Sequence, residues 1–177
     1  MTLKPRPFHA SAWAAGLGAW VGGALLLRVF PRLELEFFAR GAAQGASLFT
    51  GAPVCRIEKG WMLPFADVPV VVTEACSATG YLLIVAALVG WQLSRHGRPP
   101  LLAIAVGLGA AGPTTILVNS LRIVAVAHAH RWIIPRLPAA YDSVAHLFTG
   151  VAVFLPSLIV LNLLLQAYGS RLSPSRR

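Results

Sequence analysis

Three residues of this chain have the types that nucleophilic chemistry requires: Cys76, Arg122 and His146. A cysteine thiolate is a nucleophile, and a neighbouring imidazole or cation favours its formation. Arginine keeps its charge and can stabilise a developing oxyanion in a site with little water. If the three side chains meet, Cys76 would be the nucleophile, His146 the general base and acid, and Arg122 the stabilising cation.

The composition indicates an integral membrane protein. Of the 177 residues, 56% are hydrophobic and 12% are charged, and the mean hydropathy is +0.69. Soluble domains carry about 25% charged residues. The net charge of +9 does not indicate a nucleic-acid partner, because the basic residues lie at the ends of apolar segments and form no stripe with aromatic residues. We therefore expect contact with membrane lipid and none with nucleic acid.

The hydrophobic segments predict an all-α integral membrane protein, with a bundle of about four transmembrane helices in a single transmembrane domain over residues 1–177. The predicted spans are Ala10–Val29, Ser77–Leu93, Leu101–Ala127 and His146–Tyr168. The first span is too long for the apolar part of a signal peptide, so we expect it to remain as an anchor. We expect an interruption of the third span near Gly112-Pro113.

The segments between the spans are more polar or more irregular. Leu33–Phe49 mixes charged residues with Leu, Phe and Ala, which predicts a helix at the membrane interface or across the end of the bundle. Residues 50–75 are divided by Gly and Pro, and the β-branched run Val70–Thr73 predicts a small hairpin-like segment outside the membrane, just before Cys76. Residues 128–142 are expected to form a loop, with Asp142-Ser143 as the cap of the last helix.

Helix rise and bilayer thickness predict that the three candidate residues lie on the same side of the membrane. Pro100 and Arg122 are 22 residues apart, or about 33 Å of unbroken helix, against a hydrocarbon core of about 30 Å. Arg122 is therefore expected on the side opposite the turn at Pro99-Pro100. Cys76 begins the span that enters this turn, and His146 begins the span that leaves from the side of Arg122.

The positive-inside rule leaves the orientation nearly balanced. Apart from Arg122, the basic residues divide seven to seven between the two sides. We expect both termini in the cytoplasm, because the predicted outer segments interleave basic residues with acids such as Glu34 and Asp142, whereas the inner segments contain no acid. The chain would then be a multi-pass protein of the cytoplasmic (inner) membrane with Cys76 on the extracytoplasmic side.

Each candidate residue also has a structural interpretation. Cys76 could be a small apolar helix residue, or it could form a disulfide with Cys55, since both belong to the outer region. Arg122 could be an interfacial anchor, and His146 could simply begin a helix. Asn119, one turn before Arg122, could bond the backbone or a neighbouring helix.

Other polar and aromatic residues leave further alternatives open. Glu74 could orient a catalytic group or occupy the first turn of a helix, where acids are favourable. His128 and His130 would permit a metal site together with His146 and Cys76, but this pattern is a weak indication, and we expect neither a metal nor a cofactor. Trp61 is interpreted as part of an aromatic belt at the membrane interface.

Three short motifs resemble those of the exosortase/archaeosortase family of transmembrane cysteine proteases. Glu74-Ala75-Cys76-Ser77 resembles the nucleophile motif of that family. The segment Asn119-Ser120-Leu121-Arg122 resembles its Asn-x-x-Arg helix, and His146-Leu147-Phe148-Thr149-Gly150 is similar to its His-x-x-x-Gly segment. Their order and spacing also agree with the family. The resemblance covers roughly residues 50–168, which we expect to be the catalytic core.

The resemblance implies a cysteine endopeptidase or transpeptidase, sortase-like by convergence. It assigns the nucleophile to Cys76, stabilisation of the oxyanion or thiolate to Arg122, general acid and base catalysis to His146, and supporting roles to Glu74, Ser77 and Asn119. The family cleaves C-terminal sorting signals, which consist of a short motif, a hydrophobic helix and a basic tail. The implied partners are exported proteins with such a tail, and the acceptor of the new carboxyl end is left open.

The chain departs from the family pattern in two ways. Ala78 occupies a position where family members typically carry glycine, and about four spans make the chain a near-minimal version of the family. The rival interpretation is a non-enzymatic small membrane protein of assembly or transport, with a structural Arg122/His146 pair. A transporter would typically carry an acid at mid-membrane, and the predicted spans contain none.

Overall fold

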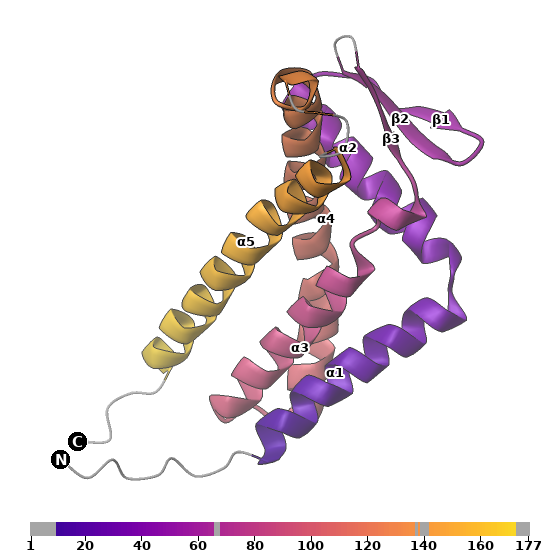
Figure 1. Ribbon diagram of the computed structural model, residues 1–177. Coiled ribbons are helices and arrows are strands. Elements are labelled where there is room, and N and C mark those ends of the chain that lie inside the picture. Colours follow the sequence, from indigo (N-terminus) through magenta and orange to yellow (C-terminus); the bar gives the residue numbers. More distant parts are fainter. Residues whose placement is uncertain (1–9, 66–67, 137, 139–141, 173–177) are drawn as a thin grey trace, which may run out of the picture.

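The computed structural model describes residues 10–65, 68–136, 138 and 142–172. Within these residues, four helices are long and apolar enough to cross a membrane, which confirms the predicted fold class. They are α1 (Ala10–Val29), α3 (Thr79–Arg95), α4 (Pro100–Trp132) and α5 (Asp142–Leu172). In Figure 1, α1 begins and α5 ends at the end of the molecule opposite the small sheet.

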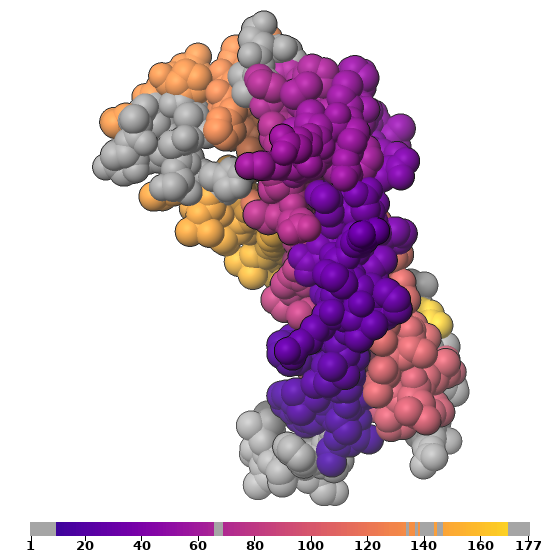
Figure 2. Space-filling view, turned by 90° about the vertical axis from the view of Figure 1, so that its right-hand side faces the viewer, coloured from indigo at the N-terminus to yellow at the C-terminus, as the bar shows by residue number. Residues whose placement is uncertain are grey.

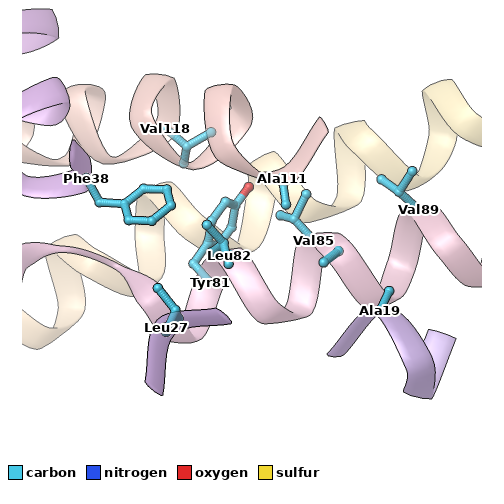
Figure 3. Close-up of a cluster of buried hydrophobic side chains, with 10 residues drawn as sticks. Ala19, Leu27, Phe38, Tyr81, Leu82, Val85, Val89, Ala111 and Val118 are labelled. Carbon is cyan, nitrogen blue, oxygen red and sulfur yellow. The ribbon is translucent and has the colours of Figure 1, made fainter. Parts of the chain in front are cut away.

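Helix α3 packs against the other three long helices. Its contacts with α1 and α4 depend on small residues: a Cβ on Gly107 of α4 would lie 2.7 Å from the carbonyl oxygen of Ala86, and Ala19 of α1 is fully buried. Close approach of this kind stabilises helix pairs in lipid, where apolar burial alone gives little driving force. Larger side chains, Tyr81 and Val85 among them, fill the space between the helices (Figure 3).

Helix α4 runs through Gly112-Pro113 as one continuous helix, so the predicted interruption of the third span is wrong. Pro113 has no N–H to donate to the carbonyl four residues earlier. A transmembrane helix tolerates such a proline when neighbouring helices support it. Helix α4 has this support, because it packs against α1, α3, α5 and the short helix α2 (Arg40–Thr50).

Helix α4 also continues well beyond the predicted end of the third span. His128, His130 and Arg131 belong to its last turns, where the sequence predicted a loop. No glycine or proline interrupts residues 114–134, so the helix ends only just before Pro135. Its 33 residues span about 50 Å at 1.5 Å per residue, so its last turns extend beyond a hydrocarbon core of about 30 Å.

A small layer of structure covers one end of the bundle, as the sequence predicted. It contains a π-helix (Glu34–Ala39), α2 and an antiparallel sheet in the order β1-β2-β3, with β1 (Cys55–Ile57), β2 (Gly60–Phe65) and β3 (Val68–Val72). Helix α2 packs closely on α4, since a Cβ on Gly41 would lie 3.0 Å from the Ile116 side chain. Figure 2 shows this purple-to-magenta layer at one end of the molecule, beyond the indigo α1.

Trp61 of β2 anchors the sheet to the π-helix. Its indole N–H donates to the Leu35 carbonyl at 3.3 Å, and the guanidinium groups of Arg40 and Arg56 lie 5.2 and 4.6 Å from the centre of its ring. Arg56 also forms an ion pair with Glu36 at 2.8 Å. Trp61 therefore has a docking role, in addition to the membrane-belt role that the sequence suggested.

Candidate active site

Figure 1 shows a short turn between β3 and α3, and Cys76 belongs to this turn. The strand leads into a 3-10 turn, Glu74–Cys76, and α3 begins three residues after Cys76. The Cys76 N–H donates to the Thr73 carbonyl, and the Ser77 N–H donates to the Glu74 carbonyl, both at 2.9 Å. A tight turn from strand to helix also holds the nucleophilic serine of α/β-hydrolases, so this turn is suited to the nucleophile role predicted for Cys76.

The supporting residues predicted on either side of Cys76 have different environments. Ser77 is buried, with 3% of its surface exposed, and it continues the turn toward α3. Glu74 is exposed and occupies the first position of the 3-10 turn. This position agrees with the structural interpretation of Glu74, because acids are favourable in the first turn of a helical segment.

The residue after Ser77 has an unfavourable backbone conformation. Ala78 has φ 57° and ψ 32°, and it is the one non-glycine residue with positive φ among those that the structure describes. A Cβ in this left-handed region costs about 1 kcal/mol, and glycine adopts the region freely. The departure from the resembled motif at Ala78 therefore has a physical consequence, because the turn after Cys76 retains the conformation that suits glycine.

Replacing Ala78 with glycine is expected to stabilise the protein by about 1 kcal/mol, because the substitution removes the steric cost of the left-handed conformation. Unfolding in detergent, followed by circular dichroism, would measure the change. Ala87→Gly, in the middle of α3, is the matched control and should destabilise by about 0.5–1 kcal/mol. Destabilisation by both substitutions would contradict the left-handed conformation of Ala78.

Asn119 of α4 connects the turn of Cys76 to the bundle. Its side-chain amide donates to the carbonyl oxygen of Cys76, and its side chain is fully buried. The bond joins two residues that are 43 positions apart in the chain. It fixes the Cys76 backbone against α4, so Asn119 joins the turn to the helix.

Cys76 and Arg122 line the same pocket. The cavity measures about 150 Å³ and has β3 on one side and α4 on the other. Its lining consists of Pro69, Val70, Val71, Val72, Cys76, Arg122, Ile123, Val126 and His130. Cys76 and Arg122 thus lie on the same side of the bundle, as the helix-length argument predicted, and the structure adds that they share one pocket.

Helix α5 determines where the Arg122 side chain can lie. A Cβ on Gly150 would lie 3.2 Å from the Arg122 Nε, so the glycine leaves room for the guanidinium stem. The guanidinium carbon lies 5.5 Å from the centre of the Phe154 ring. That ring stacks on Tyr81 at 4.8 Å. The Arg122 guanidinium therefore lies between α4 and α5, against the face of the Phe154 ring and beside Gly150.

If Arg122 has the stabilising role that the motif resemblance implies, Gly150→Ala should lower the rate of substrate processing about tenfold, because displacement of a positioned group by a fraction of an ångström misaligns it with the reacting atoms. Gly109→Ala in α4 is the control, since a Cβ there meets no atom within 4 Å. The measurement is processing of a tailed exported protein by equal amounts of each variant. Equal rates for the two variants would show that Gly150 does not control the position of Arg122.

His146 belongs to α5, four residues before Gly150, and is therefore one helical turn from the Arg122 contact. Its side chain lies outside the described residues, so its role as general acid and base stays a prediction. Helix α5 begins at Asp142, four residues earlier than the predicted span, and the predicted cap Asp142-Ser143 forms its first turn instead.

Two alternatives from the sequence do not agree with the structure. Cys55 and Cys76 are both free thiols, and Cys55 is exposed on β1. His128 and His130 lie in a helix, where residues two apart point to different sides. His128 contacts the Phe65 ring at 5.1 Å, whereas His130 lines the pocket. The two imidazoles therefore do not converge with Cys76 as the metal-site interpretation required.

Comparison with known protein families gives one match. A family model described as transmembrane exosortase matches residues 12–163. The chain belongs to the transmembrane exosortase family. The match extends over α1 and α2, beyond the region of resemblance seen in the three motifs, and it contains Cys76, Arg122 and His146. No curated protein and no solved structure gave a significant match.

Membership of the exosortase family, together with the apolar helices, identifies a multi-pass membrane protein of exosortase-type sorting. Such a protein acts on exported proteins that carry sorting signals. The resemblance stated from the sequence motifs is thereby confirmed. Membership of the family does not by itself assign a role to any residue of the pocket.

The pocket of this exosortase also contains residues that sequence reasoning did not assign to the site. His130 was considered only as a metal ligand, and the valines of β3 only as an extended run. The spacing of Arg122, Val126 and His130, four residues each, is the helical signal that could have placed His130 on the same helix face as Arg122. This spacing places His130 on the pocket side only because α4 continues past residue 127, the predicted end of the third span.

Proposed function

We propose that the protein is a membrane-embedded cysteine endopeptidase or transpeptidase. It cleaves C-terminal sorting signals, each made of a short motif, a transmembrane helix and a basic tail, from exported proteins by way of a thioester to Cys76. The observation that carries the proposal is the pocket shared by Cys76 and Arg122. A thiol and a fixed cation in one partly enclosed pocket are the groups that acyl transfer needs.

The reaction begins when the Cys76 thiolate attacks the carbonyl carbon of the scissile peptide bond, and Arg122 stabilises the oxyanion that forms. His146, having accepted the thiol proton, gives it to the nitrogen as the C–N bond breaks. The hydrophobic helix and its basic tail leave with a new amino terminus. Water or an amine then attacks the thioester, passes a proton to His146 and restores the Cys76 thiol.

The position of the pocket suits a substrate of this kind. The pocket is lined by β3 and by the C-terminal half of α4. Figure 1 shows these segments away from the end of the bundle at which α1 begins and α5 ends. A peptide bond just outside a membrane-spanning tail can reach such a site without entering the hydrocarbon core. We assign this end to the extracytoplasmic side of the cytoplasmic membrane, in keeping with the acid distribution of the sequence.

The second candidate function is a non-enzymatic assembly or transport role. The observation in its favour is that Arg122 has structural contacts with Gly150 and Phe154 of α5. Reconstitution separates the two functions. The purified protein, in liposomes together with a co-encoded exported protein that ends in a hydrophobic helix and arginines, should convert that protein to a product without its tail, seen by mass spectrometry. An intact partner after prolonged incubation would favour the non-enzymatic role.

A further inference from the structure

The strand that leads to Cys76 has an unused edge. Strand β3 pairs with β2 on one side, and within the residues that the structure describes no strand pairs with its other side. The residues of this strand from Pro69 to Val72 form one wall of the pocket that contains Cys76 and Arg122. An unpaired strand edge is a template for an additional extended segment.

The strand register indicates which backbone groups face that edge. Pro64 is opposite Pro69, and neither has an N–H, so this pair must be a non-hydrogen-bonded pair of the ladder. Hydrogen-bonded and non-hydrogen-bonded pairs alternate along antiparallel strands. Val70 and Val72 therefore bond to β2, whereas Val71 directs its N–H and C=O away from β2, toward the unpaired edge.

The two walls of the pocket have similar lengths. From Pro69 to Val72 the strand rises about 10 Å, and from Arg122 to His130 the helix rises about 12 Å. An extended peptide rises about 3.3 Å per residue, so three to four residues fit alongside each wall. Val126 and Ile123 make the helical wall apolar between the two basic side chains.

We propose that the free edge of β3 binds the substrate as an added strand of three to four residues, which leads its scissile bond to Cys76. The occupant is the extended peptide segment that precedes the hydrophobic helix of the exported protein. This inference rests on the proposed function, because it describes how the same pocket holds the substrate. Main-chain hydrogen bonds to Val71 supply affinity for peptides of varied sequence.

A proline at position 71 tests the role of the outward N–H. Val71→Pro removes this donor without removing a hydrogen bond to β2, and a proline suits an edge strand in this orientation. Val71→Ala provides the side-chain reference. Processing of a co-encoded tailed protein should be about tenfold slower for the proline variant than for the alanine variant.

The opposite edge of the sheet offers a matched control. Trp61 of β2 bonds to Val72 of β3, so it directs its N–H and C=O away from β1. Its β1 partner, Arg56, is therefore in a non-hydrogen-bonded pair, and its N–H also faces outward. Processing by Arg56→Pro should stay within about twofold of that by Arg56→Ala. Equal proline-to-alanine ratios at positions 71 and 56 would overturn the inference.

Cross-linking decides the question even if the proline variant does not fold. Val71→Cys is combined with Cys55→Ala and Cys76→Ala, and single cysteines are placed at successive positions of the tailed protein before its hydrophobic helix. Disulfide yields that alternate with a period of two are expected for an added strand. Yields that repeat every three to four positions, or no cross-link at any position, would contradict binding as an added strand.

The outcomes distinguish this inference from the proposed function. If Cys76→Ala processes the tailed protein at the wild-type rate, the proposed function fails, whatever the result at Val71. If Cys76→Ala is inactive while the proline variant equals the alanine variant and cross-links do not alternate, the function stands and the added strand is rejected.

Discussion

Cys76→Ala is expected to abolish processing of a tailed exported protein, with a rate at least about a thousandfold below that of the wild type. The thiol is the group that becomes covalently attached to the substrate in the proposed mechanism, and removal of a nucleophile commonly causes losses of this size or larger. The measurement is the appearance of the shortened product, by mass spectrometry or immunoblot, from cells or liposomes with equal amounts of each variant.

The second cysteine provides the control for this substitution. Cys55 is exposed on β1, and it does not belong to the lining of the pocket that contains Cys76. Cys55→Ala is therefore expected to process substrate within about twofold of wild type. Comparable processing by Cys76→Ala and Cys55→Ala would exclude catalysis by Cys76.

Arg122→Lys is expected to lower kcat about a hundredfold or more, although the positive charge is retained. The planar guanidinium of Arg122 lies against Phe154 and Gly150 while it lines the pocket, and a lysine cannot reproduce this geometry or its several donors. Loss of one oxyanion donor typically costs about 10²–10³ in kcat. The effect should fall on kcat more than on KM, because in the proposed mechanism Arg122 stabilises a charge that develops in the transition state.

A second arginine of α4 offers the corresponding control. Arg131 is exposed near the end of the helix, where its guanidinium lies 5.0 Å from the centre of the Trp132 ring. Arg131→Lys should leave both kcat and KM within about twofold of wild type. Retention of full kcat by Arg122→Lys would mean that a positive charge anywhere near the pocket suffices, without the specific geometry.

Hydropathy and helix length are sufficient to predict much of the fold. A membrane-spanning helix has to be about 20 apolar residues long, and this constraint determines the number of spans and the side on which each one ends. The same constraint predicts that Cys76 and Arg122 lie on one side of the membrane. The length of the spans cannot predict that Cys76 and Arg122 share a pocket, because this depends on the direction of each side chain.

Features that depend on tertiary contacts could not be predicted in this way. Pro113 favours a break when considered alone, but the helices that surround α4 support it through the proline. The left-handed conformation of Ala78 contradicts the preference of alanine, since the turn between β3 and α3 imposes it. Local preferences are overridden at such positions, and one of them lies beside the proposed nucleophile.

The pocket wall formed by β3 is a further case. The run of valines predicts a strand, but neither its place at the edge of the sheet nor its position opposite α4 follows from the composition of the run. Trp61, Arg40 and Arg56 determine where the sheet docks, through contacts between segments that are separate in the sequence. Cation–π contacts of this kind have no short-range sequence pattern.

The most direct test of catalysis by Cys76 is isolation of the thioester. Wild-type protein in liposomes is mixed with excess tailed protein, quenched in acid during turnover and digested for mass spectrometry. The expected result is a peptide with the substrate's new carboxyl end attached to Cys76, which hydroxylamine releases as a hydroxamate and which Cys76→Ala lacks. Cleavage of the tailed protein at an unchanged rate by Cys76→Ala, with no adduct on Cys76 in the wild type, would contradict the proposed mechanism.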